Sequence, residues 1–587
     1  LHEIIHSDRL IGGMDLSYRA LTRVAALKAR FPERVHTLLG NHELAQITGA
    51  GIIKDGVRSV DAFNAGVGHV FGSDADAVDA AIGAFVRSMP LALRASTPRG
   101  DILCAHSLPP AAIMARFDAT VLSRDLTVTR RNLREVVPRT LLQPLLLVFV
   151  FTYVFPKIGK IMLMLDQDGD ENYQPMSIPI DGGFPEPIFA EFANTRAHCT
   201  ECDLERSIAY FAIELNDQPV QKAYQADLAS GTLTFLGEST YGVTPIGVNA
   251  AHDKVALLES YTIGDDCLYL WANGSDTTLL CGMPMNTRAA DEDVPLTAIN
   301  ATHFTPDDRG LVFITAMFED TFGLGYLDLG AGGGIKRVTV TGAAHTGVGE
   351  LVNLDDVADN RYSLVYNIDG ASWVYEGEFD ESALTMRLTH VIAGQGELAN
   401  GVLHAVDYDA VTDSFSMSFS TALSPTQLYT VSGVDRKTVT RHTDEKVLGI
   451  PVDLLSSGED ASFISHDGLR TSARLYLPAP ALGFEGKRPL VYYVHGGPQS
   501  QERPDFSWFS MPLIQFLTLN GFAVFVPNTR GSTGYGLSYT KHVDKDWGGQ
   551  DRLDHVHALK LLADHPRVDT SGAGVVGRRQ DHLHRLD

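Results

Sequence analysis

The stretch RPLVYYVHGGP, residues 488–498, decides how the C-terminal part of the chain folds. Its apolar and aromatic residues form one continuous run, which is typical of a strand buried on both faces of a parallel sheet. The run MPLIQFLTLNGFAVFVPNTRG (511–531) predicts a helix and a second buried strand, RLDHVHALKLLADHP (552–566) another helix, and GAGVVG (572–577) a third strand. Buried strands that alternate with helices predict a doubly wound α/β sheet within residues 456–587.

Residues 157–455 have a different pattern, in which short strands and turns recur and helical periodicity is absent. One tyrosine marks each unit, at intervals of 45 to 57 residues: Tyr173, Tyr224, Tyr269, Tyr326, Tyr375 and Tyr429. A repeat of this size made of short strands predicts a β-propeller with one four-stranded blade per repeat. A large β-sandwich is the alternative, but it would not need so regular an interval. After the last repeat, ASFISHDGLRTSARLYLP (461–478) predicts two strands around an Asp-Gly turn.

Residues 1–130 alternate helical and strand patterns, which predicts a third region with an α/β layer. LSYRALTRVAALKARF (16–31) has helical spacing of its apolar residues, whereas RVHTLL (34–39) and DILCA (101–105) are expected to be strands. The remaining residues, 131–156, are expected to form a junction between this region and the propeller.

The apolar run LLQPLLLVFVFTYVFP (141–156) raises the question of a membrane span. It is shorter than the roughly 20 residues that a spanning helix needs, so a junction followed by a buried strand is expected instead. The formal net charge of −25 and the absence of any stretch rich in Lys and Arg argue against a nucleic-acid partner.

Cysteine usage bears on the compartment and on metal binding. Five cysteines are few and odd in number, which favours a reducing compartment, and we expect a cytoplasmic protein. CTEC (199–202) has the spacing of a zinc site, but no second pair of cysteines accompanies it.

Three motifs of the C-terminal region resemble the catalytic domain of the prolyl oligopeptidase family, closest to its acylaminoacyl-peptidase-like members. They are VHGGPQS (494–500), NTRGSTGYG (528–536) and DWGGQD (546–551). The resemblance implies a serine peptidase in which a propeller precedes an α/β-hydrolase domain, and which hydrolyses short peptides or acyl-peptides without a cofactor.

The same resemblance implies an oxyanion and substrate region at His495, Gly496 and Gly497. Glycines after a strand let backbone N–H groups approach a developing oxyanion.

In this family a strand such as GAGVVG leads into a G-x-S-x-G nucleophile elbow. Gly577 and Arg578 match its first two positions, but Arg579 occupies the position of the serine and Asp581 that of the second glycine. Arginine cannot act as an acyl-forming nucleophile, and the acid and histidine of a triad should follow the serine in chain order. We therefore expect this chain to be inactive, with an out-of-frame tail after Arg578.

Near the N-terminus, LLGNHE (38–43) and ILCAHSLP (102–109) resemble motifs of the calcineurin-like metallophosphoesterases. The resemblance implies Asn41 and His106 as metal ligands and His42 as proton donor to the leaving group. A divalent metal, Mn²⁺ or Zn²⁺, would then occupy a partial site, because the aspartate motifs of that family are not found upstream. Two alternatives to a peptidase stay open: a metal-dependent phosphoesterase, and a non-catalytic protein that binds a partner through the propeller.

Overall fold

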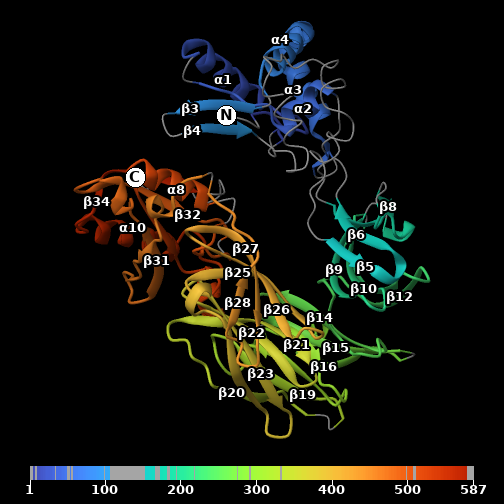
Figure 1. Ribbon diagram of the computed structural model, residues 1–587. Coiled ribbons are helices and arrows are strands. Elements are labelled where there is room, and N and C mark those ends of the chain that lie inside the picture. Colours follow the sequence, from blue (N-terminus) through green and yellow to red (C-terminus); the bar gives the residue numbers. More distant parts are fainter. Residues whose placement is uncertain are drawn as a thin grey trace. The chain divides into compact units, whose positions relative to one another are not determined.

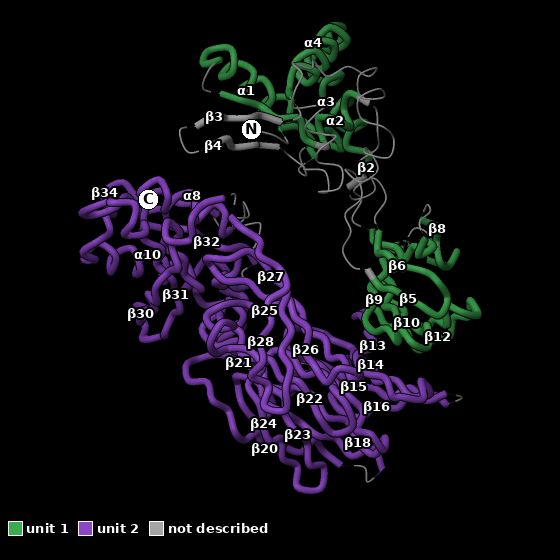
Figure 2. The backbone as a smooth tube through the Cα atoms, viewed as in Figure 1, with its two compact units in different colours: residues 1–240 green, residues 241–587 purple. Residues whose placement is uncertain are grey.

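The structure is a computed structural model of the chain, in which two compact units are distinguished: residues 1–240 and residues 241–587 (Figures 1 and 2). It describes residues 4–105 and 152–577 with short gaps at 7–9, 33–34, 49–52, 55–56, 91, 98–99, 166–171, 182–184, 193–194, 217, 274, 290–291, 331–332, 448, 498 and 507–509. Among the described residues, no helix is long and apolar enough to cross a membrane.

The first unit begins with a small helical region. Its helices and strands are α1 (Tyr18–Arg30), α2 (Asn41–Thr48), β1 (Ile53–Lys54), β2 (Val57–Arg58), α3 (Ser59–Phe71), α4 (Ala75–Arg87), β3 (Ala92–Thr97) and β4 (Gly100–Ala105). Helix α1 confirms the helix expected over 16–31. Its buried residues Tyr18 and Leu21 pack in one core with Phe63 of α3 and Val86 of α4.

The strand expected over 34–39 is wrong. Leu38 and Leu39 are buried as the pattern required, but the backbone N–H of Leu39 donates to the carbonyl oxygen of Pro90, 3.0 Å away, rather than to a strand. The strand expected over 101–105 is confirmed as β4, and it pairs with β3 as an antiparallel hairpin. The described residues thus form helices beside a hairpin, and they do not confirm an α/β phosphoesterase layer.

Among the described residues, six four-stranded antiparallel blades follow. The first unit holds β5 (Thr152–Phe155), β6 (Lys160–Leu165), β7 (Gln174–Pro179), β8 (Glu186–Pro187), β9 (Thr195–Asp203), β10 (Ile208–Leu215), β11 (Gln221–Asp227) and β12 (Thr232–Ser239). The second unit holds β13 (Thr244–Val248), β14 (Lys254–Thr262), β15 (Asp265–Ala272), β16 (Thr278–Cys281), β17 (Asn300–Phe304), β18 (Gly310–Thr315), β19 (Gly323–Asp328), β20 (Lys336–Thr341), β21 (Gly349–Ala358), β22 (Arg361–Ile368), β23 (Ala371–Asp380), β24 (Thr385–Ala393), β25 (Gly401–Asp409), β26 (Ser414–Thr421), β27 (Ser424–Ser432) and β28 (Thr438–Arg441). Each four-stranded set pairs its strands in chain order, as a propeller blade does. Strand β5 ends in the fully buried Phe155 and lies within the range expected as a junction.

The repeat predicted from the tyrosines is confirmed in detail. Five of them lie on the third strand of their own blade, namely Tyr224, Tyr269, Tyr326, Tyr375 and Tyr429, and Tyr173 immediately precedes the third strand β7. The blades of β17–β20 and β21–β24 are joined into one eight-stranded sheet, because β20 and β24 pair in parallel with Thr339 opposite Thr385.

The second unit ends in the predicted α/β region. Its elements are β29 (Glu459–Asp460), β30 (Phe463–Ile464), β31 (Arg470–Tyr476), β32 (Arg488–Val494), α8 (Met511–Leu519), β33 (Ala523–Asn528), α9 (Leu537–Lys541), α10 (Gln550–Ala563) and β34 (Val568–Gly577). The sheet has the order β29-β31-β33-β32-β34, and β32 pairs in parallel with both β33 and β34. The predicted hairpin is confirmed by the antiparallel pairing of β30 with β31.

The continuous apolar run of β32 has a direct explanation in the packing. Leu490 and Tyr492 belong to the core shared with α10, whereas Val491 and Tyr493 belong to the core shared with α8. Successive side chains of a strand point to opposite faces, so both faces of β32 are covered and both require apolar residues.

Candidate active site

The candidate active site lies at the edge of the sheet where two parallel strands end together. Val494 of β32 is the register partner of Gly577 of β34, and Tyr492 is the partner of Val575. His495 follows the first strand, and the elbow position follows the second. Residues that come directly after these two strands therefore start from the same sheet edge, where ligands bind in open α/β sheets. Arg579 itself lies outside the described residues.

His495 and Gly497 have defined local geometry. His495 is 7% exposed, and its Nε2 lies 3.0 Å from Oγ of Ser532. Because the Ser532 hydroxyl donates to the carbonyl oxygen of Thr529, 2.6 Å away, it accepts its bond from Nε2–H of His495. Ser532 is thus held as a support for the imidazole and is not a free nucleophile.

Gly497 has a φ of 145°, in a region that side chains with a Cβ rarely adopt. A Cβ at this position would lie 2.7 Å from the backbone nitrogen of Gln499. The glycine is therefore needed for the tight turn that follows His495. That the backbone N–H groups of this turn stabilise an oxyanion stays a prediction from the sequence.

The NTRGSTGYG segment supports the loop that follows this turn. The Asn528 amide bonds both backbone groups of Glu502: its Oδ1 accepts from the N–H at 2.9 Å, and its Nδ2 donates to the carbonyl at 3.0 Å. The same Nδ2 lies 3.0 Å from the hydroxyl of Tyr535, which also accepts from Gln501 at 2.9 Å. These hydrogen bonds join the loop after His495 to the NTRGSTGYG segment.

Blade residues contact both the NTRGSTGYG segment and the loop after His495. The carboxylate of Glu350, on β21, accepts hydrogen bonds from the backbone N–H groups of Gly534 at 3.0 Å and Gly536 at 2.8 Å. Burial raises the pKa of Glu350 above its ordinary value, and the two backbone bonds only partly oppose this effect. The half-buried guanidinium of Arg503 donates to the carbonyl oxygen of Gly370 at 2.9 Å and to the hydroxyl of Ser372 at 3.0 Å.

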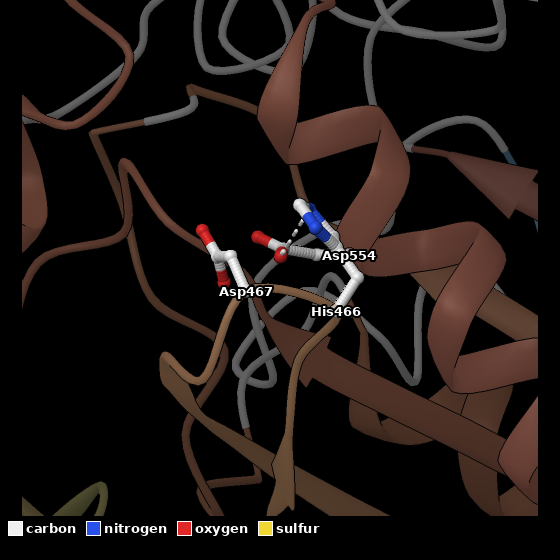
Figure 3. A group of neighbouring side chains, drawn as sticks. All are labelled: His466, Asp467 and Asp554. Carbon is white, nitrogen blue, oxygen red and sulfur yellow. Dashed lines mark ion pairs between the residues drawn. The ribbon is translucent and has the colours of Figure 1, made fainter.

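A second cluster near the sheet consists of His466, Asp467 and Asp554 (Figure 3). Their ligand atoms lie within 4.8 Å of one another, but Asp554 already has a cationic partner. Arg530 donates to its two oxygens from Nε and Nη2, each at 2.8 Å, and pairs with Asp467 at 2.9 Å. The hydrogen bonds to Asp554 raise the pKa of Arg530, so we interpret the cluster as an ion-pair network around the buried carboxylate of Asp554.

The residues expected for a phosphoesterase site are only partly described. Asn41 begins helix α2, and His106 lies outside the described residues. His42 is 8% exposed, and its Nδ1 lies 3.0 Å from Nδ1 of His6. Glu43, which is fully buried, accepts from the backbone N–H of Gly40 at 3.2 Å. The structure therefore brings His6 to His42, a neighbour that the sequence motifs did not indicate.

Two supporting residues of the candidate active site were missed from the sequence. Ser532 lies inside a quoted motif, but the motif does not say that its hydroxyl meets His495. Glu350 belongs to the propeller and has no local sequence signal, since its partners are backbone N–H groups of another domain.

Comparison with known proteins matches residues 507–578 to the model of the prolyl oligopeptidase family. An uncharacterized peptidase, YuxL, of Bacillus subtilis is 30% identical over 159 residues, which are 26% of this chain and 22% of that protein. The dipeptidyl aminopeptidase BIII of Pseudoxanthomonas mexicana is 25% identical over 417 residues, 68% of this chain and 55% of that protein. The chain thus spans a fifth to about half of these relatives.

The solved structure of a puromycin hydrolase has the same fold, with a TM-score of 0.54 at 18% identity, and the match covers 73% of this chain and 65% of that one. The family match starts before α8 and ends just after β34, so it includes the NTRGSTGYG segment and the strand that leads to the elbow position. Over these residues the chain is similar to the prolyl oligopeptidase family.

Proposed function

We propose that the second unit is a serine-peptidase scaffold that takes short peptides or acyl-peptides at the edge where β32 and β34 end. The observation that carries the proposal is the register of Val494 with Gly577, which brings the ends of β32 and β34 to the same edge of the sheet. In a peptidase of this design, the elbow serine attacks the carbonyl carbon, and backbone N–H groups near Gly497 stabilise the oxyanion. The match to the family model over 507–578 supports the assignment.

The proposal also includes the effect of Arg579 on catalysis. With Arg579 at the nucleophile position, the chain binds peptide but forms no acyl-enzyme. A guanidinium stays protonated at any ordinary pH and offers no lone pair for attack on a carbonyl. The blades that contact the loops at Gly534 and Gly536 would restrict the site to short or unfolded peptides.

Two measurements on the full chain test these statements separately. A fluorophosphonate probe should label no serine within residues 456–587, and labelling there would refute the inactivity. Calorimetric titration with a blocked acyl-dipeptide should show saturable binding that is weakened by Gly497→Ala. If no short peptide binds, the proposed substrate class is wrong, whatever the probe shows.

A metal-dependent phosphoesterase activity of the N-terminal region is the second candidate. The observation that bears on it is the buried contact of His6 with His42, whose Nδ1 atoms lie 3.0 Å apart, within hydrogen-bonding distance; imidazole is a ligand type that suits Zn²⁺. Manganese content after dialysis and hydrolysis of p-nitrophenyl phosphate test it. Both should decrease in His42→Ala, and a chain that retains no metal would rule this candidate out.

A further inference from the structure

Strand β9 contains an irregularity that brings two cysteines to one face. Cys199 is the register partner of Phe211 and Cys202 is the partner of Ala209, whereas the pairing shifts between Tyr210 and Phe211. Phe211 and Ala209 lie two residues apart on β10, so they point to the same face of the sheet. Their partners therefore share that face too, although residues three apart on a regular strand point to opposite faces. The extra residue of this β-bulge is Thr200.

The two thiols meet as a result. Sγ of Cys199 lies 3.3 Å from Sγ of Cys202. Both side chains are half-buried and pack against the core that contains Phe211 and Ala209. Tyr153 of β5 packs against the same core. The pair is thus part of the core of the first two blades.

Two carboxylates, those of Glu201 and Asp203, lie close enough to the pair to act electrostatically on the Cys202 thiol. A cation at this point would compensate the negative charge of two thiolates and would also be attracted by the two carboxylates.

We propose that Cys199 and Cys202 form a binding site for one thiophilic d¹⁰ cation of the zinc and cadmium class. Two sulfurs bound to one tetrahedral zinc at 2.3 Å are about 3.8 Å apart, so the observed pair needs to open by only about half an ångström. Each thiol loses its proton and forms one metal–sulfur bond, and the two protons pass to solvent. The remaining coordination positions would be filled by water or by a soft ligand from solution.

Cadmium titration of the full reduced chain tests the site. We expect an ultraviolet thiolate-to-cadmium band that saturates at one equivalent, with two protons released per ion. Cys199→Ser and Cys202→Ser should each lose the band. Cys281→Ser is the matched control, because Cys281 is also half-buried on a blade strand and should leave the band unchanged.

A second measurement needs no variant. Cadmium should protect Cys199 and Cys202 from alkylation by iodoacetamide, as mapped by mass spectrometry, and should not protect Cys281. Equal alkylation of Cys199 and Cys202 with and without cadmium would overturn the proposal, and so would a cadmium band that persists in the Cys199→Ser/Cys202→Ser double variant.

Discussion

Glu376 of β23 and Arg436, which follows β27, form a buried two-point ion pair between neighbouring blades. Nε and Nη2 of the arginine lie 2.9 and 3.0 Å from the two carboxylate oxygens, and the side chains are 3% and 2% exposed. Arg361 donates to the same carboxylate at 2.7 Å. The two arginines compensate the negative charge of the Glu376 carboxylate, whose burial without a partner would destabilise the fold.

Replacing Arg436 by methionine should destabilise the second unit by about 3 kcal/mol, since removing one partner of a buried pair leaves an under-compensated charge. This value is at the low end of the about 3–5 kcal/mol that the loss of one partner of a buried ion pair costs, because Arg361 remains beside Glu376. Urea unfolding followed by tryptophan fluorescence measures the change. Arg387→Met is the matched control: Arg387 pairs with Glu378 at the surface, and its loss should cost at most about 1 kcal/mol.

The same carboxylate should make stability depend on pH. Burial alone would raise the pKa of Glu376, but the hydrogen bonds and charge of Arg436, with the charge of Arg361, outweigh burial and hold the pKa below its ordinary value of 4.5. The stabilisation is therefore fully present above the unfolded-state pKa and is lost as the pH falls through the lower folded-state pKa. The difference in unfolding free energy between the wild type and Glu376→Gln should shrink from pH ~7 to pH ~3. A difference that grows on acidification would contradict this.

Gly497→Ala should weaken peptide binding while leaving the fold intact. The substitution forces an unfavourable φ and a Cβ only 2.7 Å from the nitrogen of Gln499, which costs about 1–3 kcal/mol of local strain. Calorimetry with an acyl-dipeptide measures binding, and circular dichroism reports the fold. Gly483→Ala serves as control, because this glycine also has a positive φ, of 71°, but a Cβ there meets nothing within 4 Å. Equal loss of binding in both variants would show that the turn at Gly497 is not part of the peptide-binding site.

Chelation should not affect the α/β region. Because Arg530 occupies the cationic role beside Asp554, EDTA should leave the melting temperature of the second unit unchanged. Arg530→Met should instead destabilise it by about 3–5 kcal/mol, as the buried carboxylate loses its partner. A melting temperature that decreases with EDTA and recovers with added metal would show that His466, Asp467 and Asp554 bind an ion.

The fold of the second unit could be predicted from the sequence because its signals are local. The apolar run 488–494 reports burial on both faces of β32, and the spacing of the tyrosines reports the third strand of each blade. The prediction of a strand over 34–39 was wrong because an apolar pattern reports burial and does not report strand pairing. Burial of Leu38 and Leu39 produces the same apolar pattern as a strand does, but sequence cannot show whether a neighbouring strand exists to pair with.

The candidate site was predictable only in its motifs. His495 and Gly497 lie at the expected end of a strand, but their supports, Ser532 and Glu350, depend on contacts between distant segments. The significance of CTEC also depended on structure, because its spacing predicts opposite faces for Cys199 and Cys202 on a regular strand. Only the inserted residue Thr200 brings the two thiols together.

The parallel pairing of Thr339 with Thr385 has a mechanical consequence for the blades. Neighbouring blades usually contact each other through side chains, which can slide, whereas β20 and β24 share a ladder of backbone hydrogen bonds. Parting these two blades would break directional bonds in addition to apolar contacts. We therefore expect this seam to open less readily than a seam held by side chains alone, and the strands from β17 to β24 to exchange their amide protons together.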